Sequence, residues 1–162
     1  MVREVLSGKR ININPRFGNN FLDNNALEDA LVEKILQLSS DDEHGFTMLL
    51  PYSVKDEIAR PNTPAAVKRR AGALLFSEPV SLTPNEVATH HRIRILIQGN
   101  AKAGKHDSDA FHLVESQKYG GRHFLTNDSG MLKKKLEIWQ ELQIWVLTPT
   151  EFIADYFPHA EA

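Results

Sequence analysis

The segments Phe21-Leu22-Asp23-Asn24-Asn25 and Phe124-Leu125-Thr126-Asn127-Asp128 share one pattern, a short apolar run that ends at polar and acidic residues. Each apolar run is typical of a buried strand. Elsewhere in the chain, short apolar runs alternate with amphipathic ones, as in βαβ units. The sequence therefore predicts an α/β fold, with a twisted, mostly parallel sheet and helices on both faces.

The expected elements alternate along most of the chain. Apolar runs predict strands at 20–22, 46–50, 79–82, 123–126 and 144–147. Amphipathic stretches predict helices at 27–38, 54–60, 65–76 and 109–119, from Pro84, at 131–142 and from Thr148-Pro149. Residues 1–18 are polar and irregular, so we expect an N-terminal arm followed by one domain at 19–162.

The composition narrows the class of protein. A chain of 162 residues with 41% hydrophobic and 25% charged residues is typical of one soluble globular domain. The absence of cysteine excludes disulfides, thiolate zinc sites and a cysteine nucleophile. The N-terminus has no apolar signal-peptide region, and no apolar run is long enough to span a bilayer. We therefore expect a cytoplasmic protein without a membrane partner.

Four acids are predicted to converge on one crevice. Asp23 and Asp128 each follow a strand, and the carboxyl ends of parallel strands share one edge, where ligands bind. Glu57 lies one helical turn past the strand-like run at 47–51, and Asp109 begins a helix that leads to the strand before Asp128. Carboxylates this close raise each other's pKa unless a cation is present. Oxygen-rich sites favour Mg²⁺ or Mn²⁺, which can activate water for phosphodiester hydrolysis.

The ordered set of these segments resembles the PIN-domain ribonucleases. The matching segments are 22–25, 54–58, 109–113 and 124–128, with Trp145-Val146-Leu147-Thr148-Pro149 and Glu151-Phe152 near the end. The resemblance spans about 20–157. It implies a PIN-like fold and Mg²⁺- or Mn²⁺-dependent RNA cleavage, with Asp23, Glu57, Asp109 and Asp128 as metal-binding and catalytic residues.

The resemblance also implies partners. RNA is the expected substrate, and an antitoxin protein is expected if the chain is the toxin of a VapBC-type toxin–antitoxin pair. A second copy of the chain, in a homodimer, is a further candidate partner.

One position departs from the family pattern, because it lacks a supporting hydroxyl. Asn24 stands where the family usually has Thr or Ser. Thr126 is a candidate for a comparable contact near Asp128. Asn25 and Asn127, each beside one of the acids, are further candidates for supporting contacts.

Two acids compete for the third position of the site. Residues two apart on a helix point in different directions, so Asp107 and Asp109 are not both expected to reach the metal. The spacing to Asp128 favours Asp109, and Asp107 is expected to cap the helix. His106 and His112 flank Asp109 three residues away on either side, which leaves a histidine-containing metal site open. We instead expect His112 to stack beside the crevice or to contact RNA.

The segment 99–106 imitates a phosphate-binding loop. It has the Gly-x₄-Gly-Lys spacing, and 94–98 before it has the composition of a strand. However, His106 stands where a P-loop needs Ser or Thr for Mg²⁺. We therefore expect a cationic loop over the crevice, in which Lys102 and Lys105 contact RNA phosphates.

Three other functions stay open at this stage. One is a non-catalytic RNA-binding or scaffolding module on the same fold. Another is a P-loop enzyme. The third is a phosphoryl-transfer enzyme with an aspartate nucleophile after the first strand, which is disfavoured because Asn25 stands where such enzymes need a second acid.

Overall fold

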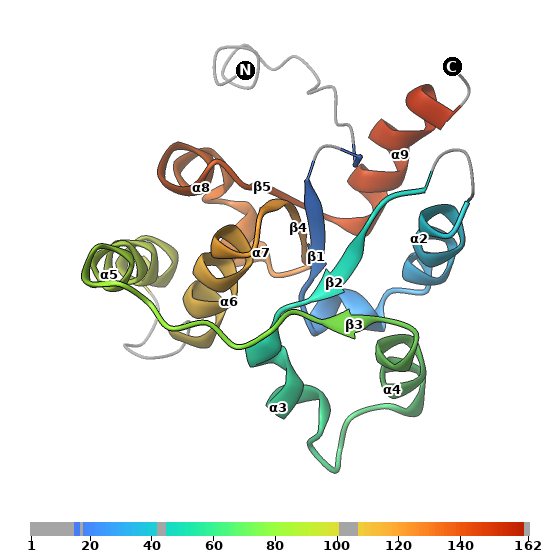
Figure 1. Cartoon of the computed structure of the whole chain (residues 1–162), viewed down its shortest axis with the longest axis horizontal. Coiled ribbons are helices and arrows are strands. Elements are labelled where there is room, and N and C mark those ends of the chain that lie inside the picture. The colour runs from blue at the N-terminus through green and yellow to red at the C-terminus, as the bar shows by residue number, and fades with distance from the viewer. Residues whose placement is uncertain (1–14, 17, 42–44, 101–106, 161–162) are drawn as a thin grey trace.

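The structure, a computed structural model, describes residues 15–16, 18–41, 45–100 and 107–160 (Figure 1). Within them, five parallel strands form one sheet in the order β3-β2-β1-β4-β5. The strands are β1 Asn19–Leu22, β2 Met48–Leu50, β3 Leu75–Phe76, β4 Gly121–Leu125 and β5 Trp145–Leu147. The chain builds outward from β1 to β3, returns to the centre and builds β4 and β5 on the other side. The predicted α/β class with a parallel sheet is confirmed.

Apart from the edge strand β3, where Leu75 is 76% exposed, the strands are largely buried on both faces because alternate side chains enter two separate cores. Phe21 and Phe124 belong to one core, whereas Leu22 and Leu125 belong to the other. This period of two places successive side chains on opposite faces of the sheet. Helices must therefore cover both faces, as the sequence predicted.

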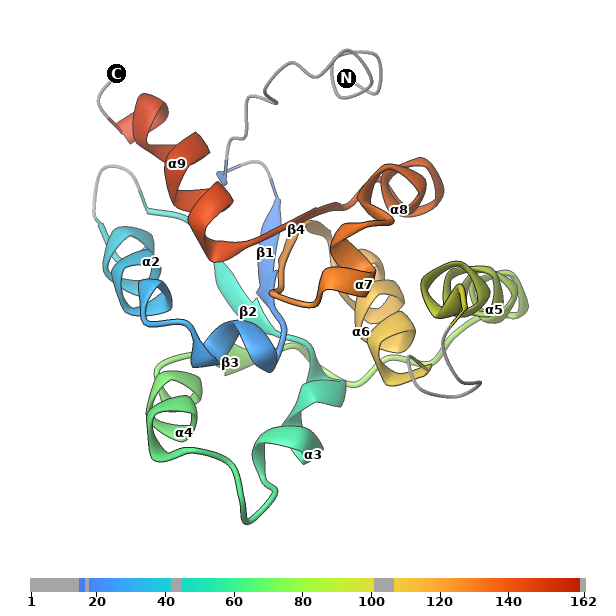
Figure 2. The ribbon, with the colours of Figure 1, turned by 180° about the vertical axis from the view of Figure 1, so that it is seen from behind.

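The helices form two groups on opposite faces of the sheet (Figures 1 and 2). One group comprises α2 Leu31–Ser39, α4 Ala65–Gly72 and α9 Pro149–Ala160, and the other comprises α5 Pro84–Gln98, α6 Asp107–Lys118, α7 Ser129–Leu132 and α8 Lys135–Leu142. The short helices η1 Asn25–Glu28, η2 Tyr52–Val54 and α3 Lys55–Ile58 follow the carboxyl ends of β1 and β2. In the described part of the chain, no helix is both long and apolar enough to cross a membrane.

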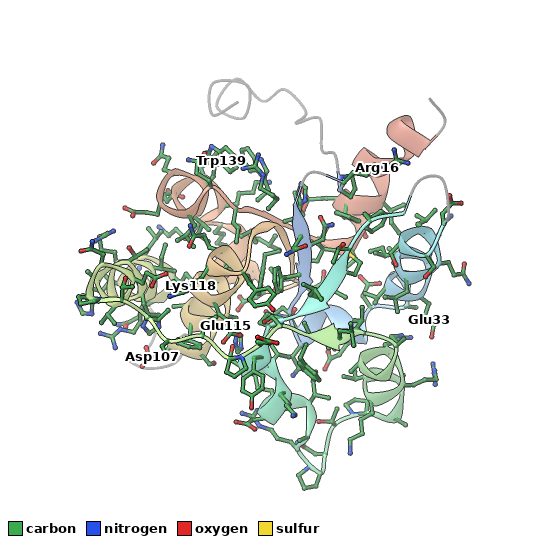
Figure 3. All side chains as sticks on the ribbon, in the orientation of Figure 1. Arg16, Glu33, Asp107, Glu115, Lys118 and Trp139 are labelled. Carbon is green, nitrogen blue, oxygen red and sulfur yellow. The ribbon has the colours of Figure 1, made fainter. Side chains whose placement is uncertain are left out.

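Two side-chain arrangements tie elements together. Trp139 of α8 and Trp145 of β5 stack with their ring centroids 4.0 Å apart and their planes 7° apart. Arg70 of α4 is buried, donates a 2.7 Å hydrogen bond to the Leu27 carbonyl and pairs with Glu33. Figure 3 labels Glu33 on α2. Arg70 therefore joins α4 to both η1 and α2.

The predicted elements are wrong around β3. The helix expected at 65–76 ends at Gly72, and Leu75-Phe76 forms the edge strand instead. The strand pairs with Leu49 and Leu50 of β2, a long-range contact that the local helical pattern does not contain. The short strand expected at 79–82 is not formed, because this stretch is irregular chain leading into α5.

Two predicted helices are each divided. The stretch 27–38 becomes η1 and α2 because the Asp29 side chain accepts from the Leu31 N–H at 3.0 Å, a local bond that competes with a continuous helix. The stretch 131–142 becomes α7 and α8, with Lys134 outside helical geometry. Residues 94–98 lie in α5, so the strand that a P-loop requires is absent there. Most of the expected arm, 1–14, lies outside the described residues.

Candidate metal centre

Asp23 lies at the carboxyl end of β1, beside β4, where the strand order reverses. Its side chain is only 3% exposed. Oδ1 accepts a 2.8 Å hydrogen bond from the Asn24 N–H, and Oδ2 lies 3.0 Å from the Thr126 hydroxyl. Burial is the main cause that raises the pKa of Asp23 to about 7, with a further rise from Asp109 and an opposing effect of His112. A carboxylate in this position requires a nearby cation to be ionised at low cost.

Thr126 connects the ends of β1 and β4. Its buried hydroxyl accepts from the Asp128 N–H at 3.1 Å and lies 3.0 Å from both Asp23 Oδ2 and Asn25 Oδ1. A hydroxyl has one hydrogen, so it donates to one of these two oxygens at a time. It donates to Asp23 when that carboxylate is ionised. When Asp23 is protonated, Thr126 can accept from it and donate to Asn25.

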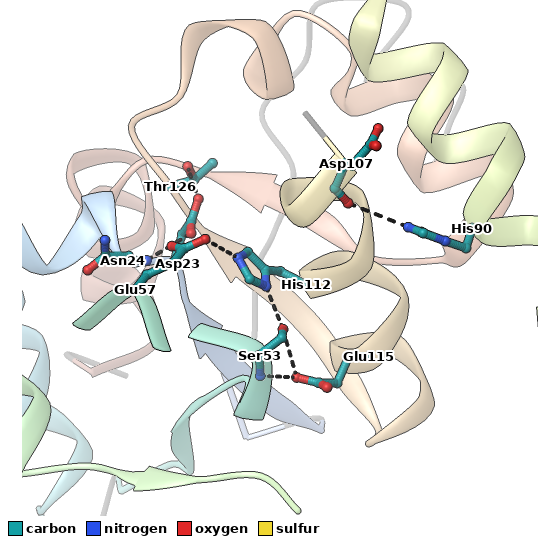
Figure 4. Close-up of polar contacts among 9 residues, drawn as sticks. All are labelled: Asp23, Asn24, Ser53, Glu57, His90, Asp107, His112, Glu115 and Thr126. Atoms are coloured by element: carbon teal, nitrogen blue, oxygen red, sulfur yellow. Dashed lines mark hydrogen bonds and ion pairs between the residues drawn. The ribbon is translucent and has the colours of Figure 1, made fainter. Parts of the chain in front are cut away.

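His112 of α6 lies next to Asp23 and is 1% exposed. Its Nε2 is 3.0 Å from Glu57 Oε1, and its Nδ1 is 2.5 Å from the Ser53 hydroxyl (Figure 4). Burial acts to lower the pKa of His112, but the Glu57 hydrogen bond and the nearby carboxylates outweigh it, so the pKa is raised. The neighbouring carboxylates therefore favour the protonated form of the ring. The side chain has almost no exposed surface in this conformation, and contact of His112 with RNA stays a prediction.

Ser53 and Glu115 fix the other side of the His112 ring. Glu115 of α6 is 1% exposed, and its Oε1 accepts from the Ser53 N–H at 2.9 Å and the Ser53 hydroxyl at 3.1 Å. A buried carboxylate requires hydrogen-bond donors, so the Ser53 hydroxyl donates its hydrogen to Glu115. The hydroxyl then accepts from His112 Nδ1–H. All of these hydrogen bonds form when both ring nitrogens of His112 carry hydrogen.

Asp23, Asp109 and His112 form a group that could hold a metal ion. One ligand atom from each lies within 4.8 Å of the others. Opposite ligands of an octahedral Mg²⁺ are about 4.2 Å apart, since each lies about 2.1 Å from the ion, so small side-chain shifts suffice for shared coordination. The two carboxylates suit Mg²⁺ or Mn²⁺, whereas an imidazole is a ligand that transition metals accept more readily. The group could therefore hold a metal ion, and both kinds of ligand atom are present for it.

Glu57 and Asp128, the other two predicted acids, lie outside this group of three. Glu57 of α3 is half-buried and contacts it through His112. Burial acts to raise the pKa of Glu57, but the hydrogen bond and charge of His112 outweigh it, so the pKa lies below its ordinary value. Asp128 caps α7, because its Oδ1 accepts from the N–H groups of Gly130 and Met131. Its backbone N–H also reaches Thr126, which links it indirectly to Asp23.

The structure separates the two acids that competed for the third position. Asp109 belongs to the candidate metal group, whereas Asp107 forms a 3.8 Å ion pair with Arg94 of α5. Helix α6 begins at Asp107 itself. A capping residue precedes the first residue of its helix, so Asp107 does not occupy the expected capping position. Asp107 thus lies at the start of α6 on the side of α5 (Figure 4).

The remaining predicted residues have different surroundings. Asn25 Oδ1 accepts from the Asn127 N–H at 3.0 Å, so both help to join the loops after β1 and β4. Lys102 and Lys105 lie outside the described residues. Sequence reasoning missed Ser53 and Glu115. No local signal marked Glu115 as buried, because Glu115-Ser116 lies at the polar end of α6, before Gln117 and Lys118.

No family model, curated protein or solved structure matches this chain. The function is therefore inferred from the chemistry of the site and from its position in the fold.

Proposed function

We propose that the protein is a divalent-metal-dependent ribonuclease that hydrolyses RNA phosphodiester bonds. The observation that supports it best is the buried Asp23 carboxylate, grouped with Asp109 and His112 where the strand order reverses. Ligands of parallel α/β sheets bind at this position. The sequence resemblance to PIN-domain ribonucleases supports the same reaction class.

Mg²⁺ or Mn²⁺ is the proposed cofactor. Asp23 and Asp109 would hold it, with His112 as a neighbouring charge while both ring nitrogens carry hydrogen, or as a third ligand once one of them is deprotonated. When bound, such an ion supplies an activated water and neutralises charge on the phosphate. The raised pKa of Asp23 is the electrostatic reason to expect that a cation binds there.

The other residues would orient groups. Glu57 is half-buried, and its lowered pKa leaves it ionised but a weak base, so it would orient the attacking water by accepting a hydrogen bond from it. The chain from Glu115 through Ser53 would hold His112 in place beside Glu57. Asp128 stays a predicted metal-site residue, one that also caps α7.

RNA is the proposed substrate, and an antitoxin and a second copy of the chain remain proposed partners. A role as the toxin of a toxin–antitoxin pair rests on the resemblance alone. Purification of the chain together with the product of its neighbouring gene would test it.

Cleavage of single-stranded and structured RNA tests the reaction. We expect hydrolysis with Mg²⁺ or Mn²⁺, little with Ca²⁺, and none with EDTA, because Ca²⁺ adopts larger and looser coordination. Asp109→Asn should abolish cleavage, whereas Asp107→Asn, prepared identically, should largely preserve it. Undiminished cleavage after exhaustive chelation would refute the metal dependence. If RNA binds but no metal supports cleavage, the chain is a non-catalytic RNA-binding module.

A further inference from the structure

A cavity of about 160 Å³ adjoins the candidate metal centre. Its walls come from the residue before η1, the end of η1, α3 and the chain that follows it, and α4. The lining residues are Asn24, Glu28, Glu57, Arg60, Asn62, Thr63, Pro64 and Val67. Glu57 lines the cavity and also contacts His112, a contact that Figure 4 shows, so the two sites share this residue.

The size of the cavity suits one aromatic ring. A cavity of about 150 Å³ engineered into another protein accepts benzene, so a volume of about 160 Å³ is enough for a single six-membered ring. Pro64, which is exposed, provides an apolar wall against which a ring face can pack, whereas Val67 beneath it is only 2% exposed. The cavity is open on one side, so a two-ring purine would extend out of it toward solvent.

The polar groups of the lining suit the edge of a base. The side-chain amides of Asn24 and Asn62 make no hydrogen bond among the described residues. Each amide offers donors and an acceptor, which are the groups that read the edges of unpaired bases in RNA. Thr63 adds a hydroxyl, which also reaches the Glu57 carbonyl at 3.3 Å.

Charge argues for a neutral base rather than a phosphate in the cavity. Glu28 and Glu57 both line it, and two carboxylates repel a phosphate group. Arg60 is the cation of the lining, close enough to lower the pKa of Glu57. It is suited to a phosphate that enters alongside the base.

We propose that this cavity binds a pyrimidine base of the RNA, next to the phosphate that is cleaved at the metal centre. Asn24 and Asn62 read the edge of the base, and Pro64 packs against its face. Because Asn24 directly follows Asp23, a base in the cavity places its own phosphate near the metal group. This inference rests on the proposed ribonuclease function and adds a base preference to it.

Binding of short RNAs tests the cavity without cleavage. Fluorescein-labelled hexauridylate and hexaadenylate would be titrated with protein in Ca²⁺, and the fluorescence anisotropy recorded. We expect hexauridylate to bind about tenfold more tightly, since one well-placed pair of hydrogen bonds to a base gives a discrimination of this order. Asn62→Ala should remove most of that preference. Asn62→Trp should do the same by filling the cavity.

Asn85→Ala is the matched control, because Asn85 is also exposed but lies on α5 outside the cavity lining. It should keep the preference for hexauridylate. Equal binding of both RNAs, a preference for hexaadenylate, or an unchanged preference in both Asn62 variants overturns the proposal. A melting temperature close to that of the parent protein shows that each variant is folded.

Mapping of cleavage sites separates this inference from the proposed function. With Mn²⁺ and an RNA of mixed sequence, the parent protein should cut beside pyrimidines, and Asn62→Ala should cut with less selectivity. Cleavage without any base preference overturns the cavity's role alone. If the binding preference is present and no metal supports cleavage, the ribonuclease function fails and the cavity stands as a pyrimidine-binding site.

Discussion

Replacing Asp23 by asparagine should stabilise the metal-free protein. The pKa of Asp23 is about 7 in the folded protein, against an ordinary value of 3.8, mainly because the carboxyl is buried. One pKa unit corresponds to about 1.4 kcal/mol, so ionising Asp23 above pH 7 costs the folded state about 4 kcal/mol. The Asp23→Asn substitution would remove this cost because the amide carries no charge.

The local hydrogen bonds allow the substitution. The amide oxygen can accept from the Asn24 N–H, as Oδ1 does now. The amide NH₂ can donate to Thr126 Oγ1, which then donates to Asn25. Burial of an amide offsets part of the gain, so we expect about 2 to 4 kcal/mol in the free energy of unfolding at about pH 8.

The stability gained by Asp23→Asn should increase as the pH rises. Below about pH 4, Asp23 is protonated in both states, and Asp23→Asn should change little. As the pH rises from about 4 to 7, the unfolded state loses its proton first, which favours unfolding of the parent protein only. The advantage of the variant should therefore grow over this range and level off above it.

Urea unfolding in EDTA at several pH values measures this difference. Asp107→Asn is the control: the Asp107 side chain is 46% exposed and pairs weakly with Arg94, so its substitution should change stability by less than about 0.5 kcal/mol. Added Mn²⁺ should stabilise the parent protein by about 2.7 kcal/mol at one hundred times Kd, and the variant much less. A variant that is less stable than the parent at about pH 8, or a gain that does not change with pH, would refute the reasoning.

Other substitutions test the RNA-binding loop and the packing of the fold. Lys102→Ala with Lys105→Ala should reduce the slope of log K against log salt for RNA binding by roughly 1.4 to 1.8, and an unchanged slope would mean that neither contacts phosphate. Arg70→Ala should lower the free energy of unfolding by about 2 to 3 kcal/mol, because it removes buried charged hydrogen bonds. The Arg69 side chain is 66% exposed, so Arg69→Ala should lower the free energy of unfolding by less than about 1 kcal/mol. Burial lowers the pKa of His123 to about 4, so the unfolded state gains its proton first and stability should fall by up to about 3 kcal/mol between about pH 6.5 and 4. His123→Asn should lack this loss, which the difference between the two urea titrations would show.

The sequence predicted the parts of the site that depend on local chain order. Asp23 and Thr126 directly follow strands, and neighbouring parallel strands bring such residues together whatever the details of packing. The arrangement around His112 depends instead on how α6 packs against η2. Ser53 is distant in the sequence from both His112 and Glu115, and no periodicity reports that contact.

The same distinction explains the errors in the fold. Leu75-Phe76 becomes a strand only because the edge of β2 is available, and a short apolar run after a helix resembles the last turn of that helix. Asp29 breaks the first predicted helix through a side-chain bond that propensity alone does not reveal. Sequence patterns therefore predict poorly those elements that depend on long-range strand pairing or on a single polar side chain.

The stacked indole rings of Trp139 and Trp145 provide an intrinsic spectroscopic probe of folding. They are the two tryptophans of the chain, and their nearly parallel rings, 4.0 Å apart, are close enough for their electronic transitions to couple. Such coupling should give paired bands of opposite sign in circular dichroism, which vanish when α8 separates from β5. Phenylalanine at either position should abolish the bands while leaving most of the apolar packing. The folded population can thus be followed without a label in each of the titrations above.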